Sequence, residues 1–172
     1  MASLEAAAGE AKRSNLKPNS EARLMTVKQV SYTFESTLET INHAEEQASK
    51  IAAAAGFSED DVMSIAMAVR EAAVNAVLHG NAYDPAKKVT LAFDTGDRDL
   101  TIIVRDQGKG LDVDSIPDPL APENLLKQSG RGIFLMRSLM DEVQIKASAT
   151  GTEVKLIKHF HGDAADSQEA SQ

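Results

Sequence analysis

Three polar residues recur at intervals of four in an otherwise apolar stretch: Glu71, Asn75 and His79, separated by AAV and AVL. Positions four apart lie on the same face of an α-helix. A carboxylate there can accept a proton from a hydroxyl or water, and an amide oxygen one turn away is a hard ligand that suits Mg²⁺. The spacing therefore indicates either a site for acid–base and metal chemistry or an ordinary solvated stripe at the border of a buried surface.

A second group of candidate residues follows an apolar run. Asp106 ends the segment LTIIVRD, and Gly108 and Gly110 follow at alternate positions. Glycine tolerates positive φ and lets the backbone approach a ligand closely. A carboxylate at the end of a strand can accept a hydrogen bond from an exocyclic amine such as that of adenine. The alternative interpretation is a simple Asp-Gly turn.

A third group, Gly130-Arg131-Gly132, opens the helical pattern IFLMRSLMDEV. Backbone N–H groups at a helix N-terminus attract phosphate, and an arginine can add charge-assisted hydrogen bonds. The alternative is a glycine-rich helix start with a solvent-facing arginine. The sequence contains no GxxxxGK[ST] motif, so a phosphate-binding loop of that kind is excluded.

The periodicity of the chain predicts the elements that carry these groups. Runs rich in β-branched residues predict five strands, at Met25–Phe34, Val89–Phe93, Leu100–Val104, Val143–Ala147 and Glu153–Lys158. A third helix, over Ile133–Met140, follows a long loop from Gly108 to Ser129. With the two helices between the first and second strands, the order predicts an α+β fold: a two-layer α/β sandwich whose mixed, mostly antiparallel sheet carries its helices on one face.

The first two helices have recognisable ends. Ser36 with Glu39 predicts a capping box before a helix that runs towards Gly56. Ser58, followed by three acidic residues, predicts the start of the next helix, which ends near Gly80. Core filling is predicted for four methionines at helical spacing: Met63, Met67, Met136 and Met140.

Composition excludes several classes of protein. The 172 residues include 26 acidic and 18 basic ones, for a net charge of −8, and no cysteine. Such a charge argues against direct nucleic-acid binding, and the lack of cysteine excludes disulfides and thiolate metal sites and fits a cytoplasmic protein. No continuous apolar run approaches the roughly 20 residues that span a bilayer, so no membrane partner is expected. We predict one domain at 25–160, between a flexible extension (1–24) and a flexible tail (161–172).

The order of these motifs is more specific than any one of them. ExxxNAxxHG, DxGxG, GRG before a helix and Gly151-Thr152 before a strand together resemble the nucleotide-binding boxes of the GHKL ATPase superfamily, over about residues 25–160. Within it, the segments EAAVNAVLHGNAYDPAKKVTL, IIVRDQGKGLD, SGRGIFLMRSLMDEV and GTEVKL are similar to the small anti-sigma-factor serine/threonine-protein kinases. The resemblance implies a Bergerat-type ATP-binding fold that uses ATP and Mg²⁺.

The resemblance also implies a role for each candidate residue. Glu71 matches the general base that takes a proton from a substrate serine, and Asn75 matches the Mg²⁺ ligand. Asp106 matches the acceptor for the adenine amine, supported by Thr152, and the pocket beside the base is shaped by Gly108 and Gly110.

The remaining matches concern the phosphates. Gly130, Arg131 and Gly132 would lie beside the phosphates, with the preceding loop as an ATP lid in which Lys127 is a further candidate for phosphate contact. His79 matches the histidine that ends the helix motif, for packing or phosphate contact. His159 and His161, although a His-x-His pair, are expected to be structural or incidental, because no further ligands lie nearby in the sequence.

The function implied is that of an ATP-dependent protein-serine kinase that acts as an anti-sigma factor: it sequesters a sigma factor and phosphorylates a serine of an anti-anti-sigma partner, as a homodimer. The alternative is a non-catalytic ATP-binding module that sequesters a regulatory protein by partner switching. Retention of Glu71 argues against that alternative, since binding alone needs no base. A histidine kinase is not expected, because no histidine precedes the first predicted strand.

Overall fold

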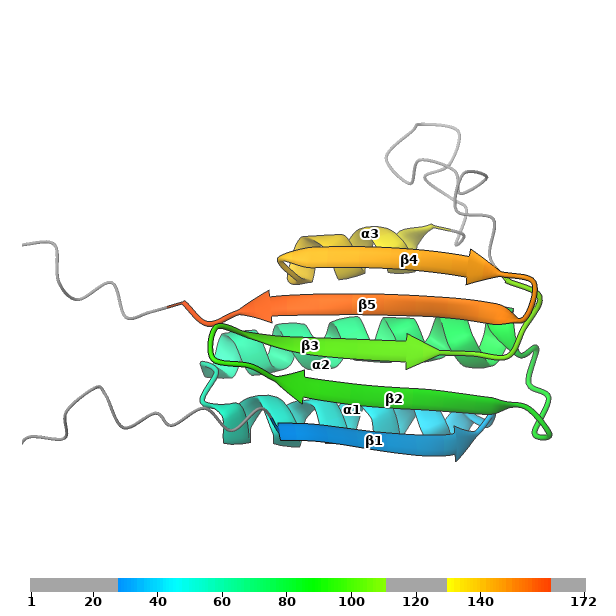
Figure 1. The fold of residues 1–172 in the computed structure, drawn as a ribbon, viewed down its shortest axis with the longest axis horizontal. Coiled ribbons are helices and arrows are strands. Elements are labelled where there is room, and N and C mark those ends of the chain that lie inside the picture. The colour runs from blue at the N-terminus through cyan, green and yellow to red at the C-terminus, as the bar shows by residue number, and fades with distance from the viewer. Residues whose placement is uncertain (1–27, 111–129, 162–172) are drawn as a thin grey trace, which may run out of the picture.

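A single antiparallel sheet forms one layer of the molecule (Figure 1). The computed structural model describes residues 28–110 and 130–161. Within these ranges the strands lie in the order β1-β2-β3-β5-β4, and all four pairings are antiparallel. The strands are β1 (Lys28–Glu35), β2 (Lys88–Thr95), β3 (Asp99–Arg105), β4 (Glu142–Ser148) and β5 (Gly151–His159).

Three helices form the second layer, side by side on one face of the sheet (Figure 1). They are α1 (Leu38–Ala55), α2 (Glu59–Val74) and α3 (Arg131–Leu139), and α2 continues without a break into a π-helical segment, η1 (Asn75–Gly80). The two-layer α+β sandwich predicted from the sequence is thus confirmed, with an antiparallel sheet in place of a mixed one. The stretch 111–129, which includes most of the predicted long loop and Lys127, lies outside the described residues, as do 1–27 and 162–172.

The core lies between the layers because strand residues alternate in exposure. In β2, Val89, Leu91 and Phe93 are buried and the residues between them are partly exposed, as expected for a sheet covered on one face. Leu91 pairs with Val104 and Phe93 with Ile102 on β3, and both partners are also buried. Opposite them, α2 presents mainly small and branched side chains that are fully buried: Ile65, Ala68, Val69, Ala72 and Ala73.

The continuous helix Glu59–Gly80 is long and apolar enough to cross a membrane, judged by length and composition alone. It packs between α1 and α3 and against the sheet, and 44% of its most apolar window is buried. A core helix passes the same test, and burial of the apolar side is what a core helix requires.

The predicted capping box at Ser36 is wrong. The N-cap of α1 is Thr37, and the Ser36 Oγ is buried without a hydrogen-bond partner among the described residues. The Ser36 N–H donates to the Lys87 carbonyl (3.2 Å), so it is not available to the Glu39 side chain as a capping box requires. The Glu39 carboxyl instead accepts hydrogen bonds from the Glu39 backbone N–H and from the Thr37 side chain, and these bonds lower its pKa.

The other predicted helix ends are confirmed. Gly56 ends α1 in the left-handed region (φ 93°), and its N–H donates to the carbonyls of Ala52 and Ala53. Ser58 is the N-cap of α2, and its Oγ accepts a hydrogen bond from the Asp61 N–H (3.2 Å).

We expect Ser58→Ala to lower the free energy of unfolding by about 1 kcal/mol, because the first turn of α2 loses its capping acceptor. Urea unfolding followed by circular dichroism measures this difference. Ser49→Ala, in the middle of α1, is the control and should leave stability unchanged or slightly higher. A Ser58→Ala protein as stable as the wild type would contradict the capping role.

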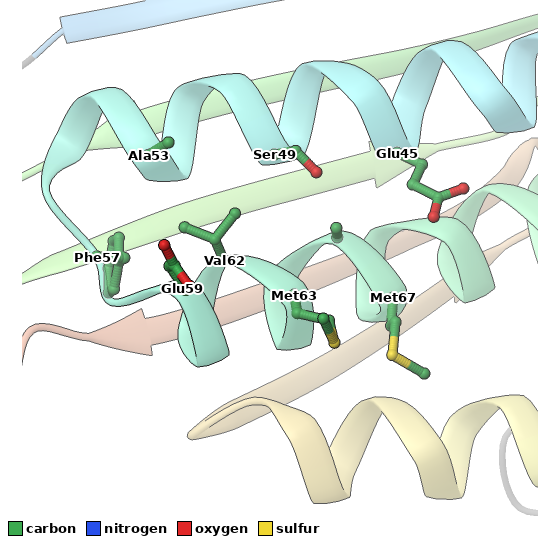
Figure 2. Close-up of a pocket in the computed structure, with 9 residues that line it drawn as sticks. Glu45, Ser49, Ala53, Phe57, Glu59, Val62, Met63 and Met67 are labelled. Atoms are coloured by element: carbon green, nitrogen blue, oxygen red, sulfur yellow. The ribbon is translucent and has the colours of Figure 1, made fainter.

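The prediction that four methionines fill the core is confirmed for two of them and wrong for the other two. Met136 on α3 and Met140 directly after it are buried, whereas Met63 and Met67 on α2 are 65% and 40% exposed. Figure 2 shows both pointing away from α1. They line an open groove of about 420 Å³ along α1 and α2, together with Glu45, Ser49, Ala53, Phe57, Glu59, Val62 and Ala66.

Candidate active site

The α2 helix brings Glu71 and Asn75 to the N-terminus of α3. Both side chains are partly exposed. A Cβ added to Gly132 would lie 2.9 Å from the Glu71 Oε2 and 3.6–3.7 Å from the amide atoms of Asn75. The absence of a side chain at Gly132 therefore leaves room for a carboxylate and an amide on one helix face, as the spacing of four predicts.

The helix changes pitch immediately after this pair. The Asn81 N–H donates to the Ala76 carbonyl, five residues earlier (2.8 Å), which is the π-helical pattern. One turn of a π-helix takes more residues than one turn of an α-helix, so the spacing of four from Asn75 to His79 follows a different pitch from the spacing between Glu71 and Asn75. His79 is exposed, and no hydrogen bond or ion pair joins it to another candidate residue within the described ranges.

The end of β3 holds Asp106 in a fixed orientation. Its Oδ1 accepts hydrogen bonds from the backbone N–H groups of Gly108 (2.8 Å) and Thr152 (3.2 Å). Its own N–H donates to the Thr152 carbonyl (3.0 Å). Thr152, at the start of β5, is buried. The predicted association of Asp106, Gly108 and Thr152 is thus present in the structure.

Close backbone contacts explain the glycines around this carboxylate. A Cβ on Gly80 would collide with the Asp106 carboxylate, and one on Gly108 would collide with the Gly80 backbone. Gly110 has a positive φ of 82° and faces the Ser148 backbone at the end of β4. The end of η1 and the turn after β3 therefore touch through glycines, so Asp106 sits at the far end of the helix that carries Glu71.

The glycines before α3 behave as predicted for a helix start. Gly130 is the N-cap, in the left-handed region (φ 89°), and its carbonyl accepts the Phe134 N–H (3.0 Å). Arg131 is exposed at the first helical position, followed by Gly132. The N-terminus of α3, where backbone N–H groups attract anions, therefore lies next to Glu71 and Asn75.

One residue of the site was missed by sequence reasoning. Asn81, which follows Gly80, is fully buried and bonds to both β2 and the turn after β3. The sequence signal that could have identified it was an asparagine directly after a helix-ending glycine. The structure adds that the next two residues, Ala82 and Tyr83, both adopt positive φ (53° and 60°).

The His-x-His pair lies at the opposite end of the sheet. His159 Nε2 is 3.6 Å from the Glu142 carboxylate, and His161 Nδ1 is 3.9 Å from that of Asp61. Each ring thus has its own acidic neighbour, on a different element.

The residues present fit a magnesium ion that a phosphate ligand helps to hold. The space next to Gly132 is bordered by the Asn75 amide and the Glu71 carboxylate, and both supply hard oxygen atoms. In the described ranges no three His, Cys, Asp or Glu side chains group as a metal site.

Fold and site together define a histidine kinase-like ATPase domain, whose family model matches residues 34–158. The chain belongs to this family and, within it, to the serine-protein kinases RsbW. It is 32% identical to RsbW of Bacillus subtilis (strain 168) over 124 residues, which cover 69% of this chain and 77% of the relative. RsbW of Bacillus licheniformis is 35% identical with the same coverage, and RsbW of Staphylococcus epidermidis is 35% identical over 115 residues, 62% of this chain and 70% of the relative.

A solved structure agrees on the fold. The crystal structure of the RsbU and RsbW domains of Rv1364c from Mycobacterium tuberculosis superposes with a TM-score of 0.57 at 22% identity. The match covers 76% of this chain and 32% of that one, so the matched part of this chain corresponds to about a third of that chain.

Proposed function

We propose that this chain is a Mg²⁺- and ATP-dependent protein-serine kinase that acts as an anti-sigma factor, sequestering a sigma factor and phosphorylating a serine of an anti-anti-sigma partner. The observation that carries the proposal is the juxtaposition at Gly132, where the Glu71 carboxylate and the Asn75 amide meet the N-terminus of α3. The membership of the RsbW family, whose relatives are named serine-protein kinases, supports the same reaction.

In this reaction the protein mainly positions the serine hydroxyl, the metal ion and the phosphates relative to one another. Glu71 would accept the proton of the substrate serine hydroxyl as the serine oxygen attacks the γ-phosphorus, the bond from that phosphorus to the β,γ-bridging oxygen breaks and ADP leaves. Asn75 would hold the Mg²⁺ ion, which supplies charge neutralisation at the phosphates when it is bound. The N-terminus of α3, with Arg131, would hold the phosphate oxygens. None of these roles requires a covalent intermediate on the protein.

The adenine end of the site is assigned to the turn after β3. Asp106 would accept a hydrogen bond from the exocyclic amine, with Thr152 holding the carboxylate from β5. Gly108 and Gly110 would let the backbone pass close to the base. Because Asp106 lies against Gly80 at the end of η1, base and phosphates would lie at the two ends of one helical segment.

Phosphorylation of a partner tests this function against the alternative of a non-catalytic partner-switch module. The protein is incubated with radiolabelled Mg-ATP and a small anti-anti-sigma domain from the same cell, with a variant of that domain in which the acceptor serine is alanine as the control. We expect label on the serine form alone. ATP binding without any label would favour the non-catalytic module.

The partners and the assembly belong to the same proposal. Sequestration predicts a complex with a sigma factor that dissolves when an unphosphorylated anti-anti-sigma partner is added, within the cytoplasm and without a membrane or nucleic acid. A homodimer predicts about twice the monomer mass of 18.4 kDa in light scattering.

A further inference from the structure

Asn81 joins three parts of the site with one buried amide. Its side chain is completely buried. The Nδ2 donates to the Lys88 carbonyl at the start of β2 (3.0 Å), and the Oδ1 accepts the Gln107 N–H beyond β3 (2.8 Å). The Gln107 Oε1 in turn accepts the Lys88 N–H (2.7 Å). These three hydrogen bonds form a closed ring among three residues, which we call the Asn81 clamp: Asn81, Lys88 and Gln107.

The clamp holds the segment that carries the Asp106 carboxylate. Gln107 stands between Asp106 and Gly108, and the Oδ1 of Asp106 is already fixed by two backbone N–H groups. The direction of the carboxylate therefore follows the position of this turn. Gly80, the residue before Asn81, packs against the same carboxylate, so Asn81 fixes both sides of that contact.

The backbone that follows Asn81 adopts an unusual conformation that its surroundings hold in place. Ala82 and Tyr83 follow with positive φ, which non-glycine residues adopt at a cost and keep only where the surroundings determine it. The Tyr83 N–H donates to the Val77 carbonyl (2.9 Å), and the Asp84 N–H donates to the Asn81 carbonyl (3.1 Å). The clamp and these two bonds bind the irregular turn to the π-helical segment.

We infer that Asn81 is a positioning residue for nucleotide recognition: it keeps Asp106 in register with Glu71 and Asn75, and so sets the affinity for the adenine nucleotide. The inference rests on the proposed function, because it assigns the base to Asp106. An apolar residue at position 81 would take away the partners of the Lys88 carbonyl and the Gln107 N–H, both in part-buried hydrogen bonds, and the turn would move to satisfy them. Asp106 would then move relative to the helix.

A double-mutant cycle on ATP affinity tests this role. The Kd of Mg-ATP is measured by calorimetry for Asn81→Ala, Gln107→Ala, Asp106→Asn and the doubles with Asp106→Asn. We expect Asn81→Ala to weaken binding about tenfold and Gln107→Ala about threefold. Since Asn81 acts through Asp106, both effects should shrink to less than about twofold in the Asp106→Asn background. Gln107 is exposed, so its variant tests the clamp even where Asn81→Ala does not fold.

Lys158→Met is the control for a merely structural effect. Lys158 is a buried residue at the opposite end of the sheet, 3.3 Å from the Asp61 carboxylate, and its Nζ donates to the Leu139 carbonyl (3.1 Å). Its replacement should lower the melting temperature without changing the Kd of Mg-ATP.

Two results would overturn the inference, and they are distinguishable. If Asp106→Asn weakens ATP binding but the Asn81 and Gln107 effects persist in full beside it, Asn81 does not act through Asp106 and the proposed function stands. If Asp106→Asn leaves ATP affinity unchanged, the adenine role of Asp106 fails, and the role of Asn81 fails with it.

Discussion

Glu71→Gln is expected to reduce the rate of partner phosphorylation by about 10²–10³-fold while the Kd of Mg-ATP changes less than about twofold. Glutamine has the same shape, so the contact with Gly132 and the neighbouring Asn75 is preserved. Its amide cannot accept a proton from the attacking serine hydroxyl. Single-turnover phosphorylation with radiolabelled ATP measures the rate, and calorimetry measures the affinity.

Glu59→Gln is the matched control for this variant. Glu59 opens the same helix but lines the groove between α1 and α2, so the same chemical change there should leave phosphorylation intact. A Glu71→Gln protein that phosphorylates its partner at the wild-type rate would remove the base assignment. Equal losses of rate and of ATP affinity would instead indicate that Glu71 serves binding.

Local patterns predicted the layers of the fold because each one reports a physical constraint. Alternating burial in β2 and β3 follows from a sheet covered on one face. Ser58 and Gly56 mark helix ends because each satisfies otherwise unpaired backbone groups. The capping box predicted at Ser36 was wrong because the Ser36 N–H, which a capping box needs, already donates to the Lys87 carbonyl beside β2.

The sequence could not predict features that depend on contacts between distant elements. The composition of NAVLHG does not predict a π-helical segment. In the structure this segment ends where Gly80 and Gly108 pack together. Met63 and Met67 have apolar side chains at helical spacing, yet α2 meets α1, α3 and the sheet on its other sides and leaves them exposed.

The candidate site likewise has a part that local spacing predicted and a part that depends on contacts between distant elements. Glu71 and Asn75 were predictable because one helical turn relates them. The proximity of Gly132, which comes from a different helix 57 residues after Asn75 in the sequence, depends on how α3 packs on α2. Asn81 was not singled out because a buried asparagine is recognised only by its partners, which here lie on β2 and beyond β3.

Asp106→Asn is expected to weaken Mg-ATP binding by about 10–100-fold, the cost of losing a hydrogen bond to a charged acceptor. The Oδ1 of asparagine still accepts the N–H groups of Gly108 and Thr152, so the fold is kept. Those two donors also prevent the amide from flipping, because a flip would place an NH₂ group against them. The asparagine therefore presents its NH₂ to the adenine amine, donor against donor.

Asp94→Asn on β2 is the control for this loss of charge, since Asp94 bonds to Gln29 on the neighbouring strand and not to the site. At saturating ATP the Asp106→Asn protein should phosphorylate its partner at close to the wild-type rate, because Glu71 and Asn75 are untouched. Glu71→Gln shows the reverse, with normal affinity and a slow reaction. The two variants, Glu71→Gln on α2 and Asp106→Asn in the turn that packs against the Gly80 end of η1, would thus separate transfer of the phosphate from recognition of the base. A loss of rate at saturating ATP in Asp106→Asn would show that the two ends of the site are not independent.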